Sequence, residues 1–163
     1  MNAVTPALFR ACPTPNALAE MPLSHIEELV HSTGFFRAKA KHLKGLSGTL
    51  VRDFDGQVPD RMDDLLTLPG VARKTANVVL GVAYGKAEGV VVDTHVKRLS
   101  NRMGFTDETT PEKIERSLMT VFPRRDWIDL SHILIFHGRR TCRARKPACA
   151  ECPVNRQCEY SAG

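Results

Sequence analysis

Four cysteines near the end of the sequence are the residues most committed to one kind of chemistry. Cys142, Cys149, Cys152 and Cys158 follow the spacing C-x6-C-x2-C-x5-C. Four thiolates this close together can enclose a metal centre, and a 4Fe–4S cluster takes four cysteine ligands. A structural zinc site commonly uses paired C-x-x-C knuckles or mixtures of cysteine and histidine, whereas this stretch has a single C-x2-C knuckle. The spacing therefore favours an iron–sulfur cluster, with zinc and a pair of disulfides as the alternatives.

Lys74 is the residue best placed to act as a nucleophile. Residues 68–76, LPGVARKTA, predict two helices joined by a very short turn. Arg73 and Lys74 then fall in the first turn of the second helix, where the helix macrodipole disfavours cations. The dipole and the neighbouring guanidinium both favour the uncharged amine, which is the form that Schiff-base chemistry requires. A lysine that is only solvated, or that touches a phosphate, is the alternative.

The turn before Lys74 could bind an anion. Pro69 and Gly70 interrupt the first helix, and Val71 can tuck between the two helices. Backbone N–H groups at the start of the second helix would then face outward, where a phosphate of a DNA backbone would fit. A helix–helix corner without any ligand accounts for the pattern equally well.

Asp93 is the second residue with possible chemistry. It follows three valines and precedes the segment Thr94–Arg98, so it can act as the N-cap of a helix. A carboxylate placed after a buried segment can also protrude into a cleft and manage protons. Both interpretations stay open.

The composition is that of a globular protein with one core or two small lobes. The sequence has 163 residues, of which 42% are hydrophobic and 25% charged. No apolar run approaches the ~20 residues of a membrane span, and residues 1–10 lack the regions of a secretory signal. We therefore expect a cytoplasmic protein, in which reducing conditions keep thiols free for metal. The fifth cysteine, Cys12, is expected to be a free thiol.

Positive charge is gathered in two places. The net charge of +5 is common in proteins that meet nucleic acid, although many other proteins share it. One basic group surrounds the cysteines and consists of Arg139, Arg140, Arg143, Arg145, Lys146 and Arg156. The other consists of Arg37, Lys39, Lys41 and Lys44. Each group could contact phosphate or be a solvated face.

Helical periodicity and helix-end residues predict an all-α chain in which helices position these side chains. The expected helices run from an S-x-x-E capping box at residues 24–27 to Gly34, over residues 35–46 with an end near Gly45 and Gly48, and over 60–68, 73–83, 94–103, 111–122 and 126–136. Thr110 and Gly138 are the expected limits of the last two. Residues 6–9 look like the interior of a further helix. Residues 90–92 predict a buried extended connector rather than a sheet.

The motifs together resemble one family. The hairpin at 68–76, Val92-Asp93-Thr94-His95, His137-Gly138-Arg139 and the cysteine quartet occur in one order. That combination closely resembles endonuclease III, a DNA glycosylase and AP lyase of the helix-hairpin-helix superfamily with an iron–sulfur cluster. The resemblance covers nearly the whole chain. It implies base excision repair near the nucleoid, on duplex DNA with an oxidised pyrimidine or an abasic site. A monomer is the default expectation.

The resemblance also implies a role for each motif. Lys74 matches the nucleophile that attacks C1′, expels the base and holds the sugar as a Schiff base before β-elimination. Asp93 matches the aspartate that activates the lysine or stabilises charge on the sugar. The implied DNA-binding residues are Gly70, Val71, Ala72 and Arg73 of the hairpin, where Ala72 replaces a usual glycine, and Arg143, Arg145 and Lys146. Cys142, Cys149, Cys152 and Cys158 match the ligands of a 4Fe–4S cluster that supports structure and DNA binding rather than bond cleavage.

The implied fold is the helix-hairpin-helix glycosylase fold, with a partial six-helix domain at residues 1–88 and an iron–sulfur cluster domain at residues 89–163. Family members carry additional N-terminal helices, one of which fills the gap left by the flipped base. This sequence begins after them, so we expect an N-terminally truncated chain with impaired activity, whether from a misassigned start, a fragment or a degraded gene product. Two alternatives stay open: a non-catalytic iron–sulfur module that binds DNA, and an adenine-mismatch glycosylase, which would lack the lysine found at position 74.

Overall fold

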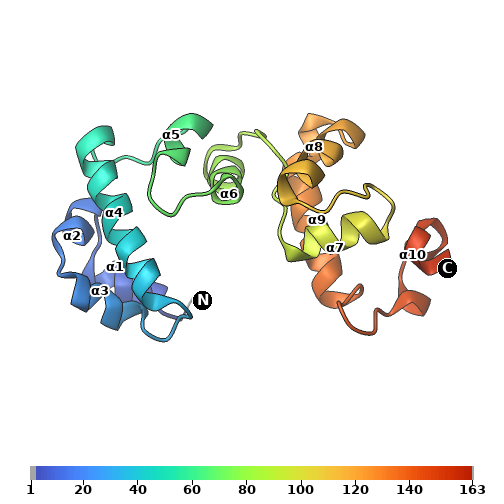
Figure 1. Cartoon of the computed structure of the whole chain (residues 1–163), viewed down its shortest axis with the longest axis horizontal. Coiled ribbons are helices and arrows are strands. Elements are labelled where there is room, and N and C mark those ends of the chain that lie inside the picture. Colours follow the sequence, from blue (N-terminus) through green and yellow to red (C-terminus); the bar gives the residue numbers. More distant parts are fainter. Residues whose placement is uncertain (1–2, 163) are drawn as a thin grey trace. The chain divides into compact units, whose positions relative to one another are not determined.

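Helices make up all the regular structure in residues 3–162, the part of the chain that the computed structural model describes (Figure 1). No strand occurs among these residues, which confirms the expected all-α class. No helix among them is both long enough and apolar enough to cross a membrane.

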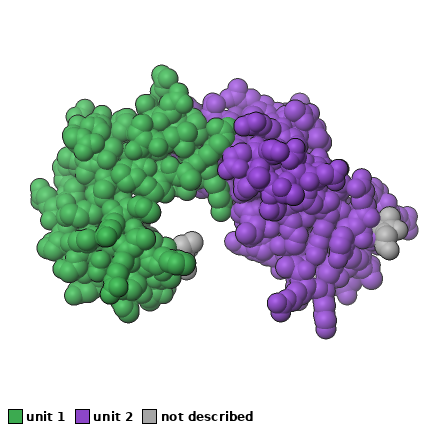
Figure 2. Space-filling model, viewed as in Figure 1, with its two compact units in different colours: residues 1–76 green, residues 77–163 purple. Residues whose placement is uncertain are grey.

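The chain divides by its internal contacts into two compact units, residues 1–76 and 77–163 (Figure 2). This division falls inside helix α6 (Arg73–Tyr84), earlier than the boundary after residue 88 that the sequence suggested. The first turn of α6 therefore belongs to unit 1 and the rest of the helix to unit 2.

Unit 1 is built around one long helix. It contains α1 (Thr5–Ala11), α2 (Pro15–Glu20), α3 (Leu23–Val30), α4 (Phe36–Phe54) and α5 (Met62–Leu66), and α4 lies against both α2 and α3. The helix expected around residues 6–9 is present as α1. The buried side chains that these helices share are Leu8, Cys12, Leu18, Ile26, Val30 and Ala40.

Several helix ends differ from the sequence expectation. Ser24 is not an N-cap, because α3 begins at Leu23 with Pro22 in the capping position. Thr110 does occupy the N-cap position of its helix, but its side chain makes no capping hydrogen bond. Helix α5 is shorter than the expected segment 60–68. Helix ends fray and the last turn is often 3₁₀, so helix boundaries are the least predictable part of an element.

Two helices continue through glycines that were expected to end them. Helix α4 passes Gly45 and Gly48 and ends at residue 54, where Asp55 and Gly56 adopt positive φ angles of 51° and 74°. Its second half is held by burial of Leu50 and its neighbours. Helix α9 likewise passes Gly138, which lies against α7. Tertiary packing outweighs the low helix propensity of glycine in both helices.

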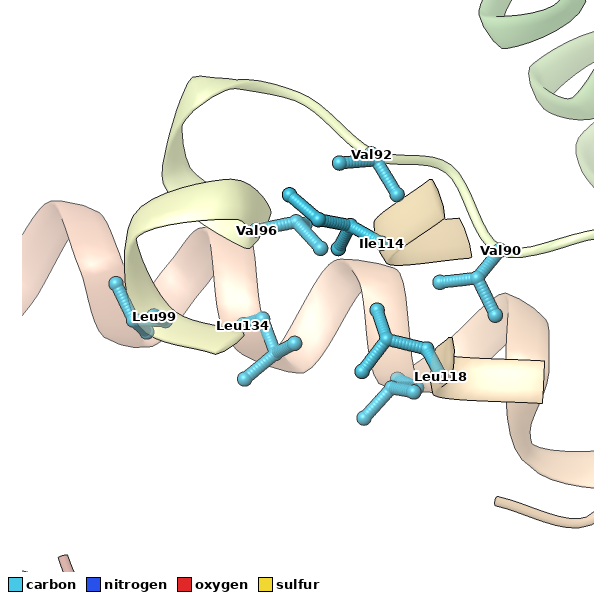
Figure 3. Packing of buried hydrophobic residues seen from close by; sticks show 8 residues of the cluster. Val90, Val92, Val96, Leu99, Ile114, Leu118 and Leu134 are labelled. Carbon is cyan, nitrogen blue, oxygen red and sulfur yellow. The ribbon is translucent and has the colours of Figure 1, made fainter. Parts of the chain in front are cut away.

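Unit 2 packs three helices over an extended connector. The connector at residues 85–93 leads into α7 (Thr94–Arg102), α8 (Pro111–Val121) and α9 (Trp127–Arg140). Short 3₁₀ turns lie at Arg124–Asp126, Cys149–Glu151 and Asn155–Gln157, and α10 (Glu159–Ala162) follows. Val90 and Val92 are buried, which confirms the expected buried connector. Figure 3 shows these two valines among side chains of α7, α8 and α9; the cluster is Val90, Val92, Val96, Leu99, Ile114, Leu118, Leu130 and Leu134.

The buried cluster of unit 2 predicts how a core substitution changes stability. Leu118 is completely buried, with 0% of its surface exposed, so Leu118→Ala leaves a cavity and lowers the free energy of unfolding by about 3 kcal/mol. Val121 lies on the same helix with 53% of its surface exposed, and Val121→Ala is expected to change it by less than about 0.5 kcal/mol. Denaturant unfolding checks both; equal effects would contradict the assigned core.

Candidate active site and metal centre

The hairpin between α5 and α6 packs against α4 within unit 1, where Gly45 faces Pro69 and His42 lies beside Gly70. Leu65 and Leu68 are buried, and the N–H of Val71 donates to the carbonyl of Leu68 at 3.1 Å. These contacts fix the turn, while Ala72 and Arg73 remain exposed. The hairpin residues singled out from the sequence therefore lie together on one short, anchored turn.

Gly70 is the residue that this turn requires. Its φ angle is +79°, and a Cβ at this position would lie 2.8 Å from Cβ and Cγ of His42. Any L side chain would meet both the backbone strain and the His42 side chain. Glycine therefore allows the hairpin to approach α4 closely.

Lys74 lies in the first turn of α6, as expected, and its side chain is exposed. Among residues 3–162 its amine makes no hydrogen bond or ion pair. An unpaired, exposed amine beside the hairpin is accessible to a substrate.

Asp93 is the N-cap of α7, which confirms one of the two interpretations of this residue. Its Oδ1 accepts hydrogen bonds from the N–H groups of His95 and Val96, both at 2.8 Å. Neither bond uses Oδ2, and the side chain is half-buried. The capping role fixes the carboxylate and leaves one oxygen for other chemistry, so the two interpretations are compatible. Asp93 belongs to unit 2 and Lys74 to unit 1.

The four C-terminal cysteines line one cavity in unit 2. Cys142, Cys149, Cys152 and Cys158 share its wall with Met103, His137, Pro147 and Tyr160 among others. All four are half-buried free thiols, so the disulfide alternative is not supported. Within the described range 3–162, no three His, Cys, Asp or Glu side chains converge closely enough to hold a single ion.

Arg98 and Arg102 of α7 hydrogen-bond to the segment that leads into the cysteine loop, residues 142–158. The sequence analysis did not identify these two arginines. Arg98 Nη2 donates to the carbonyls of Gly138 and Cys142 at 3.1 and 2.9 Å. Arg102 Nη1 donates to Cys142 Sγ at 3.3 Å, and its guanidinium lies 4.4 Å from the centre of the Tyr160 ring. Their spacing of four residues on one helix was the available sign that they share a face.

The basic loop after Cys142 is held by its backbone. Arg102 donates from Nη1 to the carbonyl of Arg143 at 2.8 Å and from Nη2 to that of Ala144 at 3.0 Å. The side chains of Arg143, Arg145 and Lys146 are exposed. A fixed backbone with exposed cations suits contact with a polyanion.

The second basic group is not uniformly available for contact with phosphate. Lys44 Nζ donates to the carbonyls of Ala19 and Met21 at 2.8 and 2.6 Å, so this lysine satisfies the end of α2. Arg37 lies 5.4 Å from the centre of the Phe36 ring. Lys41 is exposed and Lys39 half-buried. Lys44 therefore has a structural role rather than a role in phosphate binding.

The aromatic residue Phe35 was also missed. It stands just before α4 with 90% of its surface exposed and a φ angle of +57°. A phenylalanine in this conformation is unusual, and so is one so fully exposed. The sequence offered a sign of it, because Gly34-Phe35-Phe36 is followed directly by Arg37.

Cys12 is unrelated to the quartet. It is buried in unit 1, and its thiol lies 3.4 Å from Met21 Sδ. Burial raises the pKa of the Cys12 thiol, so the uncharged form is favoured. The expectation of a free thiol is confirmed.

A family comparison defines the class of this protein. Residues 1–124 match the family described as HhH-GPD superfamily base excision DNA repair protein. Endonuclease III of Synechocystis sp. is 58% identical over 158 residues, covering 97% of this chain and 72% of that protein. Endonuclease III of Bacillus subtilis is 42% identical over 159 residues, again with 97% and 72% coverage.

A solved structure agrees with these relatives. It is described as a trapped endonuclease III–DNA covalent intermediate in an estranged-adenine complex, with a TM-score of 0.93 and 39% identity over 99% of this chain and 76% of that one. This chain belongs to the endonuclease III family. It is a base excision repair enzyme with DNA glycosylase and AP lyase function. Neither alternative function considered from the sequence receives better support.

Proposed function

We propose that this protein removes oxidised pyrimidines from duplex DNA and cleaves the abasic strand through a Schiff base on Lys74. The observation that carries the proposal is the exposed, unpaired amine in the first turn of α6, directly after the anchored hairpin. Within the hairpin motif at residues 68–76, this amine is the group that is nucleophilic when neutral, and it is exposed.

The proposed chemistry uses the Lys74 amine as the nucleophile and the Asp93 carboxylate as its partner. Lys74 Nζ bonds to C1′ of the flipped nucleotide, and the base departs with the electrons of the glycosidic bond. Opening of the sugar ring gives an imine between Nζ and C1′. Loss of a C2′ proton then pushes electrons toward C3′, and the 3′ phosphate leaves. Water finally hydrolyses the imine and restores the amine.

Asp93 is proposed to assist at the proton-transfer stages. Its Oδ1 is committed to the α7 N-cap, so the carboxylate is held in one orientation. The remaining oxygen can accept a proton from the attacking amine or stabilise positive charge on the sugar. A fixed carboxylate acts without first having to be ordered.

DNA contact is proposed at the hairpin and at the basic loop. Gly70, Val71, Ala72 and Arg73 would bind backbone phosphate in one place, and Arg143, Arg145 and Lys146 in the other. The similarity to a trapped endonuclease III–DNA intermediate supports this proposal. Such contacts are independent of sequence, and their strength falls with salt. Base flipping, which costs least at a damaged pair, would add selectivity.

Phe35 is proposed as an aromatic contact with the bases. An exposed ring next to Arg37 can stack on a base or enter a base step that flipping has opened. Phe35→Ala is expected to weaken binding to abasic duplex by about 10- to 100-fold, the range for loss of one stacked base. Fluorescence anisotropy checks this value. Phe9, another exposed phenylalanine of unit 1, is the control, since Phe9→Ala should bind normally; equal loss in both variants would contradict the proposal.

The cysteine quartet is proposed to hold a 4Fe–4S cluster. Four thiols that line a common cavity fit this group. When bound, the cluster would fasten the loop that carries the basic residues. Arg102 would donate an N–H to the sulfur of one ligand, Cys142.

The assembly state and the location are proposed from the default for such a chain and from its free thiols. We propose a monomer in the cytoplasm, associated with the nucleoid, because the free cysteines require a reducing compartment. Its substrates would be duplexes with a damaged pyrimidine or an abasic site.

The proposed function is tested by trapping the imine. The protein is mixed with a labelled duplex that contains one abasic site, and borohydride is added to reduce the imine. A covalent adduct on a denaturing gel is expected. Strand cleavage without any adduct would contradict the Schiff base, and the same duplex without an abasic site is the control.

A further inference from the structure

A buried polar contact lies between α6 and α8 in unit 2. Asn77 of α6 and Glu115 of α8 have 4% and 5% of their surfaces exposed. Asn77 Nδ2 donates to Glu115 Oε1 at 2.8 Å, across 38 residues of sequence. Burying a carboxylate and an amide is unfavourable unless both are paired, so this contact needs an explanation.

The backbone of the connector, residues 85–93, packs closely against Asn77 and Glu115. Gly89 is buried, and a Cβ at this position would overlap Glu115 Oε1 and lie 2.7 Å from Asn77 Nδ2. No side chain fits between the connector backbone and the two polar groups. Three elements, α6, the connector and α8, therefore meet at one point.

Lys74 and Asp93 each lie only a few residues along the chain from this contact. Asn77 follows Lys74 by three residues, which is about one turn of the same helix. Gly89 precedes Asp93 by four residues, and between them the N–H of Val91 donates to Ser131 Oγ at 2.9 Å. The contact thus restrains the helix that carries the amine and the connector that carries the carboxylate.

Packing alone does not account for the residue types. Asn77 Oδ1 is buried and has no hydrogen-bond partner among residues 3–162, and an unsatisfied buried acceptor lowers stability. Apolar residues of similar size would often be more stable at such a place. Sequences tend to keep such locally unfavourable choices where function depends on them.

We propose that Asn77, Gly89 and Glu115 form a positioning contact for the lyase reaction. They do not touch the substrate. They hold two segments against α8: the part of α6 next to Lys74, and the part of the connector that precedes Asp93. This inference rests on the proposed function of Lys74 and extends it to three residues that lie outside the reacting groups.

The first test separates positioning from binding. Glu115→Leu removes the acceptor, whereas Glu115→Gln keeps an oxygen for Asn77 Nδ2. The rate of borohydride trapping on abasic duplex is measured in single turnover, beside the Kd for the same duplex. We expect Glu115→Leu to slow trapping about tenfold or more with little change in Kd, since small misplacements of reacting groups have effects of this size. Glu115→Gln should keep most of the rate, and so should the control Glu112→Leu on the exposed face of α8.

Equal rates for the parent chain and Glu115→Leu would overturn the proposal, and so would an equal loss in Glu115→Gln and Glu115→Leu. Gly89→Ala provides a second variant that reaches the contact from the connector. It should reproduce the slow trapping of Glu115→Leu, because the added methyl displaces the carboxylate. Normal trapping by Gly89→Ala would contradict the proposal.

The second test does not depend on activity. Amide hydrogen exchange is followed in α6 of the parent chain and of Glu115→Leu. Faster exchange in residues 74–80, with unchanged exchange in α9, is expected if the contact holds α6. Unchanged exchange in α6 would overturn the proposal even if the parent chain traps DNA. An absence of trapping in the parent chain, with faster exchange in the variant, would instead contradict only the proposed function.

Discussion

Lys74→Ala is expected to abolish the covalent adduct with abasic DNA and to slow strand cleavage by about 10³-fold or more, as removal of a nucleophile does in other enzymes. The physical reason is specific to the amine. Without Nζ no imine forms at C1′, and the C2′ proton is not acidified. Borohydride trapping and gel-based cleavage kinetics measure the two losses. The exposed position of Lys74 predicts a stability change within about 0.5 kcal/mol.

Two matched variants separate the nucleophile from its charge. Lys74→Arg keeps a cation in the first turn of α6 but cannot form the imine at neutral pH, so it should bind abasic duplex and yield no adduct. Lys113→Ala removes an exposed lysine of α8 whose partner is Glu108 at 3.5 Å, and it should trap normally. An adduct that persists in Lys74→Ala would assign the nucleophile to another group.

Cys152→Ala is expected to have the second largest effect. Loss of one of four ligands should remove the iron and the brown colour of the purified protein. The loop that carries Arg143, Arg145 and Lys146 would then no longer be held in place by the cluster. Because the phosphate contacts of this loop are lost, affinity for duplex DNA should fall about tenfold or more. Visible absorbance, iron analysis and anisotropy measure the three changes.

The fifth cysteine is the natural control for this experiment. Cys12 is buried in unit 1, outside the quartet, so Cys12→Ala should keep both the iron and the colour. Its expected effect is a loss of packing in unit 1. Colourless parent protein with one equivalent of zinc would show that the quartet holds a single ion, and would overturn the assignment of a cluster.

Much of the candidate site was predictable because it is encoded over short distances along the chain. The quartet spans 17 consecutive residues, so its spacing alone limits what it can enclose. The same is true of the hairpin, where Gly70 and the first turn of α6 are neighbours of Lys74. The cap formed by Asp93 uses N–H groups only two and three residues away. Interactions of this range depend on local sequence.

Other features required the folded chain. The length of α4 and the passage of α9 through Gly138 depend on burial against other helices, which local propensity does not describe. The hydrogen bonds from Arg102 to the cysteine loop cross about forty residues. The exposure of Phe35 likewise depends on what surrounds it in space.

The sequence by itself determined which chemistry this protein can perform: an amine at the start of a helix, a carboxylate at the start of another, and four thiols in a short loop. Only the tertiary structure decided how these groups are supported. It brought Asn77, Gly89 and Glu115 to one point and placed the arginines of α7 on the cysteine loop. The reason is that residue types and local spacing are properties of the chain, whereas burial and partnership between distant residues exist only after it has folded.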